Sequence, residues 1–360
     1  MNNRILYILV LFVLSLIVAC DSTETPPADN TNIPGDPSGV TVPTPTLNNA
    51  LPTATFTPSS GIMKINLQGL LDPTTNQPIQ FTYNANNPQS SNIFIQEDGV
   101  VKGLSVTKVG SGNVLSADVV FCVDNSGSMD QEADSVAASI IEFANYLQSS
   151  GLDVKFAVVG FSVSGDINGG INFTNAQTLN TYLNRFTGTY RTEGFSGPDS
   201  AALYNRANNF GYAGDENGIM ACLFADSVFA WRAGAQRVMI LFTDEPTQSN
   251  GVNWTNSVGC SLLSGKATVH TVFSEDTTYY SSYWSQTDER PWEISTCTGG
   301  TIKFIPESAT GLNLIDLPVA GTLTNSYLVQ YRTSTPGTHT VKITVSTSTA
   351  DGSKTYSVTY

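Results

Sequence analysis

Asp124-Asn125-Ser126-Gly127-Ser128-Met129 follows the apolar run Val119-Val120-Phe121-Cys122-Val123. A continuous apolar run bounded by polar residues predicts a buried strand that ends in a loop. The loop would carry one carboxylate and two hydroxyls, which are oxygen ligands for a hard cation such as Mg2+. Because one carboxylate cannot satisfy such a cation, we expect other loops to supply further oxygens.

Around this stretch, apolar strands alternate with helices. We expect strands at 154–161, 171–173, 238–242, 267–273 and 302–305, and helices at 130–148, 175–186, 198–209 and 216–231. Buried strands that alternate with helices indicate a parallel sheet covered on both faces. Residues 118–321 are therefore predicted to form an α/β domain with a doubly wound, mostly parallel sheet.

The two flanks of this domain read as strands only. Period-two alternation and turn signals predict strands at 62–67, 92–96, 100–101 and 104–109, and at 327–331, 341–345 and 356–358. Neither segment, 61–117 or 322–360, is large enough to bury a core well alone. We therefore expect one small antiparallel β-sandwich built from both flanks, with the α/β domain inserted in it.

Further oxygen ligands are expected at the same edge of the sheet as Asp124. Thr243-Asp244-Glu245 follows the apolar strand 238–242, and Gly214-Asp215-Glu216-Asn217 precedes an apolar helix. In an open α/β sheet, ligands bind beyond the carboxyl ends of the strands. In the alternative reading, Ser126 and Ser128 cap the helix at 130–148 and the acids are solvated.

The combination resembles a von Willebrand factor A domain with a metal-ion-dependent adhesion site (MIDAS). The matching segments are 119–129, 214–223, 231–237 and 238–246, within about residues 118–320. The resemblance implies that Asp124, Ser126, Ser128 and Asp244 hold a divalent cation, with Asp244 often acting through water. It implies Mg2+, with Mn2+ or Ca2+ as alternatives.

The third loop departs from the common family pattern, in which a threonine is the ligand. Gly214-Asp215-Glu216-Asn217 is more similar to the acidic version of integrin β subunits and bacterial relatives. We favour Glu216 as the ligand because it stands directly before the helix, with Asp215 as its alternative. Thr189 and Thr192 are upstream candidates. Integrin β subunits also have their A-like domain inserted in a β-sandwich.

Other polar residues could serve either a functional or a structural role. Asp130 and Glu132 suit a second cation site, although acids in the first turn of a helix are also favoured by its dipole. His270 lies within a predicted strand and His339 at a hairpin, so we expect core or surface roles.

The loops 187–214 and 275–292 are long and rich in Tyr and Trp. We expect the first to shape specificity and the second to recognise a ligand or pack over the sheet edge.

The N-terminus reads as an export signal. Arg4, the apolar stretch 5–19 and Cys20 resemble a bacterial lipoprotein signal, in which residues 1–19 are removed and Cys20 is lipidated. The alternative is a plain signal peptide. Residues 21–60 hold eight Pro and nine Thr but no Lys or Arg, which predicts that residues 20–60 form an extended stalk.

Export leaves four further cysteines in an oxidising compartment, where disulfides are expected. We favour a pairing of Cys260 with Cys297, and less firmly of Cys122 with Cys222, for which buried free thiols are the alternative. The sequence has no C-x2-C spacing, the pattern that would indicate a metal site made of cysteines.

Composition and motifs bound the function. The formal net charge of -14 argues against nucleic acid or anionic lipid as a partner. The sequence lacks H-E-x-x-H, G-x-S-x-G and Walker motifs, so we expect no enzyme. We expect a lipid-anchored protein of the bacterial envelope that binds a protein or glycan carrying an acidic group. The alternative is a structural subunit of an envelope complex that uses the same site for a fixed partner.

Overall fold

The computed structural model describes residues 32–360, except residues 76, 109–115, 151, 187–193, 250, 252, 276–281, 283, 286–287, 318–321 and 324. The expected signal peptide (1–19), Cys20, and the candidates Thr189 and Thr192 lie outside the described residues.

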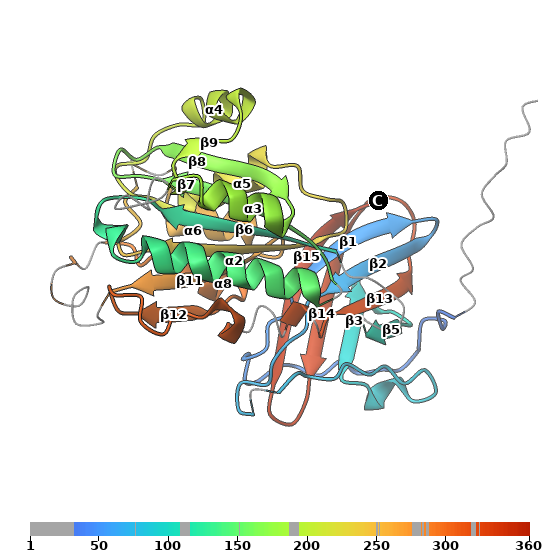
Figure 1. The fold of residues 1–360 in the computed structure, drawn as a ribbon. Coiled ribbons are helices and arrows are strands. Elements are labelled where there is room, and N and C mark those ends of the chain that lie inside the picture. The colour runs from blue at the N-terminus through green and yellow to red at the C-terminus, as the bar shows by residue number, and fades with distance from the viewer. Residues whose placement is uncertain are drawn as a thin grey trace, which may run out of the picture. The chain divides into compact units, whose positions relative to one another are not determined.

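A seven-stranded sheet has the order β12-β11-β10-β6-β7-β8-β9 (Figure 1). Its strands are β6 (Ser116–Asp124), β7 (Asp153–Phe161), β8 (Ile167–Thr174), β9 (Gly197–Pro198), β10 (Gln236–Thr243), β11 (Thr268–Ser274) and β12 (Ile302–Ile305). All neighbouring pairs are parallel except β7 with β8. The central strand β6 is buried from Ala117 to Asp124, which explains why its sequence is continuously apolar.

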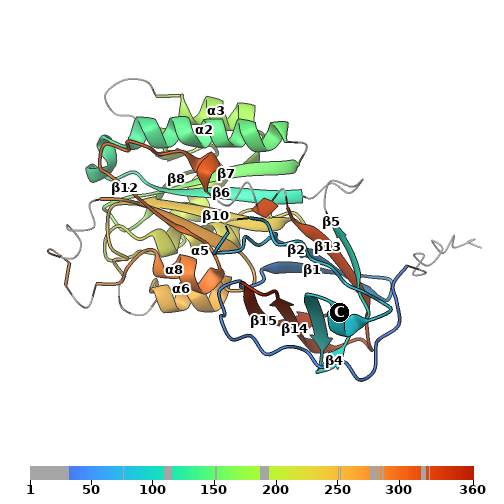
Figure 2. The same ribbon diagram turned by 90° about the horizontal axis from the view of Figure 1, so that it is seen from below.

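Helices cover both faces of this sheet. They are α2 (Ala133–Ser149), α3 (Ala176–Leu183), α4 (Ala201–Asn208), α5 (Gly218–Val228), α6 (Asn256–Leu263) and α8 (Glu293–Thr298). In Figure 2, α2 and α3 lie on one side of the sheet, and α5, α6 and α8 lie on the other. The predicted doubly wound, mostly parallel sheet is confirmed, whereas α6 and α8 were not predicted.

The flanks form two four-stranded antiparallel sheets, in the orders β1-β2-β13-β5 and β15-β14-β3-β4. The strands are β1 (Ala54–Ser59), β2 (Ile62–Leu67), β3 (Ile93–Glu97), β4 (Val100–Val101), β5 (Ser105–Lys108), β13 (Tyr327–Arg332), β14 (Thr338–Ser346) and β15 (Asp351–Thr359). Each sheet takes strands from both flanks. Ile95 pairs with Ile343 across β3 and β14, and both side chains are fully buried in one shared core. The expected sandwich around an inserted domain is therefore confirmed.

The predicted stalk is wrong for its described part. Residues 54–59 form β1, and residues 33–53, which we call the N-terminal strap, are bonded to the sandwich. The Asp351 carboxylate accepts backbone N–H bonds from Thr46, Leu47 and Asn48 at 2.7–2.8 Å. Lys102 Nζ lies 2.6 Å from Asp36 Oδ2. The Pro- and Thr-rich composition suggested a solvated linker. It could not reveal these contacts, because they join residues far apart in sequence.

Side-chain hydrogen bonds join the sandwich to the α/β domain. Gln68 donates to Thr322 Oγ1 and accepts from Thr268 Oγ1, and all three residues are buried. Asn66 Nδ2 donates to the carbonyl of Gly234. Residues Ile33–Tyr360 accordingly form one compact unit. Within the described residues, no helix is both long and apolar enough to cross a membrane.

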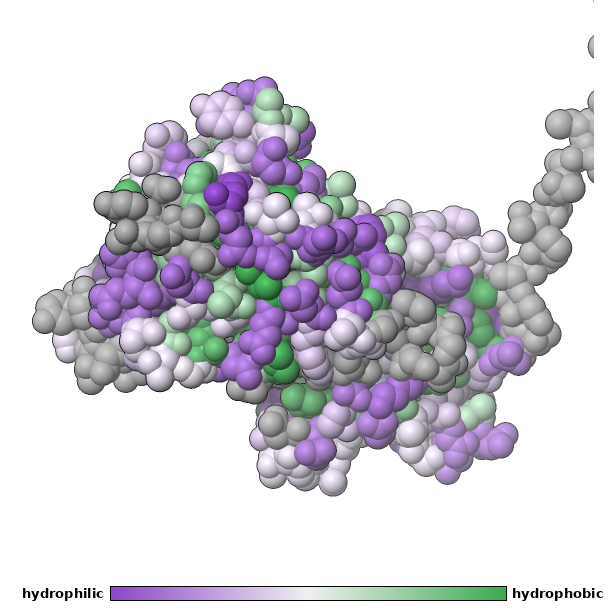
Figure 3. Space-filling view, viewed as in Figure 1, coloured by the Kyte–Doolittle hydropathy of each residue, from purple (hydrophilic) through white to green (hydrophobic). Residues whose placement is uncertain are grey.

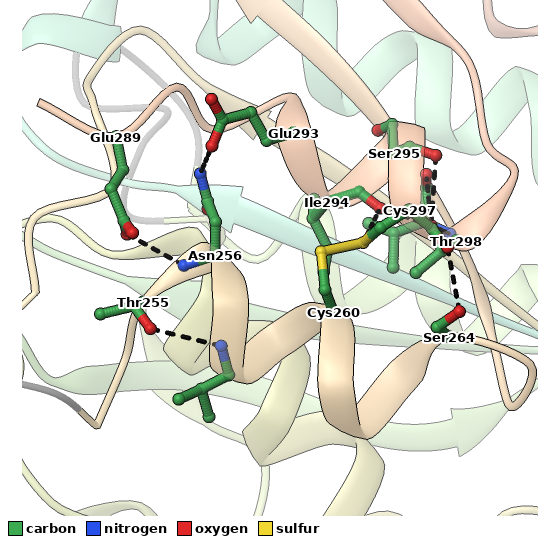
Figure 4. Close-up of a disulfide and its surroundings, with 12 residues drawn as sticks. Thr255, Asn256, Cys260, Ser264, Glu289, Glu293, Ile294, Ser295, Cys297 and Thr298 are labelled. Atoms are coloured by element: carbon green, nitrogen blue, oxygen red, sulfur yellow. Dashed lines mark hydrogen bonds between the residues drawn. A yellow bond between two sulfur atoms is a disulfide. The ribbon is translucent and has the colours of Figure 1, made fainter.

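One of the two expected disulfides is present. Cys260 of α6 and Cys297 of α8 are bonded, which confirms that pairing (Figure 4). The second pairing is wrong, because Cys122 and Cys222 are free thiols with their Sγ atoms 3.8 Å apart. Both thiols are fully buried between β6 and α5, in an apolar core that raises the pKa of Cys122. A protonated, buried thiol is a poor nucleophile for disulfide formation.

The described part of the second aromatic loop packs over the sheet edge. Trp292 contacts Phe273 of β11 and Phe304 of β12, with ring centroids 5.0 and 5.1 Å apart. Trp284 stacks on Trp292. This arrangement favours the packing interpretation for these residues, while Tyr279, Tyr280 and Tyr283 lie outside the described residues.

Ile343→Ala should loosen strands of the N-terminal flank, because Ile343 shares its core with them. We expect the free energy of unfolding to fall by about 2–5 kcal/mol. In native-state hydrogen exchange, the amides of β3 should exchange faster together with those of β14. Lys342→Ala, next to it on the opposite face of the strand, is the control. Unchanged exchange in β3 while β14 opens would show that the flanks fold separately.

The cysteine assignment predicts a distinct alkylation pattern. Iodoacetamide should leave Cys122 and Cys222 unmodified in the native protein and modify both in guanidinium chloride without reductant. Cys260 and Cys297 should react only after reduction. Peptide masses report each site, and a Cys122–Cys222 linked peptide in the unreduced digest would contradict the assignment.

Candidate metal centre

Parallel pairing of β6 with β10 brings the first two predicted loops together. Val123 is in register with Phe242, so the next residues, Asp124 and Thr243, lie side by side at the carboxyl ends of the strands. Thr243 Oγ1 donates a 2.8 Å hydrogen bond to Asp124 Oδ2. Asp124 and Thr243 are both buried, and this bond holds the carboxylate in a fixed orientation.

A chain of polar contacts connects four of the predicted ligands. The Ser126 N–H donates to Asp124 Oδ1 at 3.0 Å. Ser126 Oγ lies 2.9 Å from Ser128 Oγ, and Ser128 Oγ donates to Asp244 Oδ1 at 3.2 Å. The structure thus brings Asp124, Ser126, Ser128 and Asp244 to one place on the edge of the sheet.

These separations fit a small octahedral cation. Mg2+ binds oxygens at about 2.0–2.1 Å, which places neighbouring ligand oxygens about 2.9 Å apart. The Ser126–Ser128 and Ser128–Asp244 oxygen pairs lie at 2.9 and 3.2 Å. Among the described residues, no group of three Asp, Glu, His or Cys side chains suits a metal ion. The serine hydroxyls lie at separations that suit cation ligands beside Asp244.

Glu216 stands apart from this chain of contacts. Its side chain is buried in the third loop, next to the N-cap of α5, and Gln248 Nε2 donates to its Oε2 at 3.3 Å. Asn217 caps α5 by accepting from the Met220 N–H, which fixes the loop against the helix. No described contact joins Glu216 or Asp215 to Ser126 or Ser128. The Oδ1 atom of Asp215 is buried without a described hydrogen-bond partner.

The carboxyl groups at this edge are electrostatically crowded. Burial and the charge of Asp244 raise the pKa of Asp124 to about 7. Burial raises the pKa of Glu216 to about 8, with contributions from Asp124 and Asp215. Burial and the charges of Glu275 and Glu307 raise the pKa of Asp244 to about 6. Such crowding of desolvated like charges is relieved by protons or by a cation.

The serines do not cap the following helix. The N-cap of α2 is Glu132, which makes no side-chain capping bond, and the hydroxyls of Ser126 and Ser128 face each other instead. The alternative reading of these serines is therefore wrong.

Of the remaining polar candidates, Glu132, His270 and His339 have side-chain partners, whereas none is described for Asp130. Glu132 is fully buried, and its Oε1 accepts a hydrogen bond from Ser274 Oγ at the end of β11. Asp130 is exposed in a short turn. His270 is buried within β11, and His339 lies 2.7 Å from Asp98 on the sandwich. The core and surface roles expected of the two histidines agree with these positions.

Two residues of this edge were missed in the sequence. Thr243 orients Asp124 through its hydroxyl. Its position directly before Asp244 could have indicated this role, because a hydroxyl there faces the end of the neighbouring strand. Gln248 binds Glu216 through its side chain and also through its backbone N–H. Nothing in its sequence context distinguishes it from other loop glutamines.

Comparison with known proteins gives a family for the central domain. The model of the von Willebrand factor type A domain matches residues 118–272. No curated protein matches the chain in sequence.

Two solved structures are similar to the chain. Proximal thread matrix protein 1 from the mussel byssus, with a zinc-occupied MIDAS motif, is 15% identical with a TM-score of 0.37, and the match covers 63% of this chain and 50% of that one. The pilus adhesin SpaC from Lactobacillus rhamnosus GG is 12% identical with a TM-score of 0.33, and the match covers 86% and 48%. The chain thus spans about half the length of these proteins. Matched by the family model and built on a mostly parallel sheet between two layers of helices, residues 118–272 are a von Willebrand factor type A domain.

Proposed function

We propose that this chain is a binding module of the bacterial envelope that grips its partner through a divalent cation held at the carboxyl edge of the central sheet. Asp124, Ser126, Ser128 and Asp244 hold the cation, and Glu216 supports it from the third loop. Mg2+ fits this set of hard oxygen donors, and Mn2+ or Ca2+ would use the same atoms.

The observation that carries the proposal is the contact of Ser126 Oγ, Ser128 Oγ and Asp244 Oδ1 at octahedral spacing. Ser128 is exposed, whereas Asp124 and Ser126 are buried. A cation in this set would be held on its inner side by buried ligands, and a partner could reach it from the solvent side. Two neutral hydroxyls among the ligands leave the cation strongly electrophilic, so it attracts a carboxylate of a protein or glycan.

The surface near this edge offers a partner apolar contacts. Tyr212 and Val163 are 64% and 58% exposed. Their loops are joined by a 2.7 Å bond from the Ala213 N–H to the Gly165 carbonyl, and Asp215 follows on the same loop. Hydrophilic residues cover most of the face seen in Figure 3, where hydrophobic residues form only small groups. Tyrosine is favoured at recognition surfaces, so this pair of loops is suited to contact the partner.

The anchoring part of the proposal rests on the sequence. A lipidated Cys20 would hold the protein at a membrane, and the segment between Cys20 and the N-terminal strap would act as a tether shorter than the predicted stalk. The net charge of -14 supports binding to proteins or glycans rather than nucleic acid. The proposed role is binding without catalysis.

Asp124→Asn should abolish Mg2+ binding while the protein stays folded. The buried carboxylate has a raised pKa, so a neutral amide there should not destabilise the metal-free protein. The wild type should gain about 2.7 kcal/mol of stability at a Mg2+ concentration one hundred times the dissociation constant. Calorimetry and thermal unfolding measure both quantities. Glu142→Gln, exposed on α2, is the control for a charge change away from the site. Global unfolding of Asp124→Asn would show that Asp124 is structural.

Thr243→Val should weaken Mg2+ binding by about 10–100-fold, the usual cost of losing a residue that orients a ligand. The substitution keeps the shape of the side chain and removes only the hydroxyl that binds Asp124. Calorimetric affinity is the readout. An unchanged affinity would show that Asp124 does not depend on this bond.

Binding of the partner should depend on the cation. Immobilised wild-type protein should capture envelope proteins or glycans with Mg2+ present and release them with EDTA, and Asp124→Asn should capture neither. Capture that persists in EDTA would contradict the proposed mechanism.

A further inference from the structure

A cavity lies at the opposite end of β11 from the metal edge. It has a volume of about 480 Å3, within the range of small-molecule sites. Its walls come from three parts of the chain: the N-terminal strap, the segment after β2, and the segment from α8 into β12 with His270 of β11 beside it. The lining includes Leu51, Gln68, Leu70, His270, Thr296 and Thr301.

His270 lines this cavity and carries a buried hydrogen-bond donor that no described residue uses. His270 is 2% exposed, and Thr301 makes two contacts with its Nδ1: the backbone N–H donates to it at 3.1 Å, and Oγ1 lies 2.8 Å from it. Burial lowers the pKa of His270 to about 3, so the ring is neutral. Because the Thr301 backbone N–H can only donate, Nδ1 accepts from it and the ring proton is on Nε2. Nε2 has no hydrogen-bond partner among the described residues. A buried donor without an acceptor costs about 1–3 kcal/mol, so the ring is poised for an acceptor.

The local fold holds this ring in place. Thr268 and His270 lie on the same side of β11 because side chains alternate along a strand, and Thr268 Oγ1 is bound to Gln68. A Cβ at Gly300 would lie 1.8 Å from the Val269 carbonyl oxygen, so only glycine allows the turn after α8 to press Thr301 against His270. The Cys260–Cys297 bond joins α8 to α6 (Figure 4).

The walls favour an uncharged occupant. None of the residues that line the cavity is Asp, Glu, Lys or Arg, although the chain has a formal net charge of -14. Asn48, Pro73 and Thr296 at the mouth are exposed, while Gln68 and His270 at the floor are buried. Leu51, Leu70, Leu71 and Pro73 supply apolar surface between them. At the floor, the Nε2–H group of His270 is a donor that still lacks an acceptor.

We propose that this cavity is a binding site for a small uncharged molecule with a mainly apolar body and one oxygen that accepts a hydrogen bond from His270 Nε2–H. An ammonium group is excluded because it offers no acceptor to the donor. A carboxylate is disfavoured because no cation lines the cavity to offset its desolvation. This site is independent of the metal edge and does not rest on its proposed function.

Cyclohexanone is a suitable probe, since it combines an apolar ring with a single carbonyl oxygen. Histidine labelled with nitrogen-15 gives two ring systems in this chain, His270 and His339. His339 is paired with Asp98 on the sandwich and is the internal control. We expect the His270 Nε2 resonance to shift saturably with a dissociation constant on the order of 1–10 mM. The His339 resonances should not move, and cyclohexylammonium should have no effect.

Two variants separate the cavity from the donor. Thr296→Trp at the exposed mouth should block cyclohexanone while leaving the His270 tautomer unchanged. His270→Phe keeps an apolar ring and should weaken the ketone about tenfold, as expected for one lost hydrogen bond. An unshifted His270 resonance at saturating probe, a proton on Nδ1 instead of Nε2, or undiminished binding to Thr296→Trp would each overturn the proposal. The resonance of His270 itself decides the matter if His270→Phe does not fold.

Discussion

The hydrogen bond between Thr243 and Asp124 joins the two central strands of the sheet at the point where both end. It exists because β6 and β10 pair in parallel register, so that the residues after Val123 and Phe242 come side by side. The same pairing places Ser126, Ser128 and Asp244 within reach of one another. Ionised carboxylates at this edge destabilise the folded protein, because the buried carboxyl groups there raise one another's pKa values. A divalent cation would relieve this repulsion with atoms that are already in place.

The sandwich holds the inserted domain through strands from both flanks of the chain. Each of its sheets combines strands from both ends of the chain, so the inserted domain is tied to the sandwich at both of its own ends. Gln68 adds a side-chain link between the two by accepting a hydrogen bond from Thr268. The N-terminal strap then fastens onto Asp351 of β15.

Much of this fold could be predicted from the sequence because the strongest signals are local. The apolar runs at β6 and β10 and the alternation in β2 specify burial directly. Asp124, Ser126, Ser128 and Asp244 could be grouped because parallel strands end at one edge. Glu216 could be placed near that edge, but whether it contacts the serines depends on a loop conformation that sequence patterns do not encode.

The misses share a physical cause, namely contacts between residues distant in sequence. The N-terminal strap resembles a linker in composition, and its bonds to Asp351, Lys102 and Gln89 help make it part of the fold. Helices α6 and α8 are short, and the disulfide between them supplies stability that helix periodicity does not reveal. Cys122 and Cys222 are neighbours as predicted, yet proximity alone does not make a bond. The orphan donor of His270 depends on the turn at Gly300, which is visible only in three dimensions.

The most direct test is the position of a bound cation. Crystals of the protein grown with Mn2+ and measured near the manganese absorption edge should show an anomalous peak about 2 Å from Ser126 Oγ and Ser128 Oγ, with Asp244 beside it. A peak at another place, or no peak at this edge at saturating Mn2+, would contradict the account.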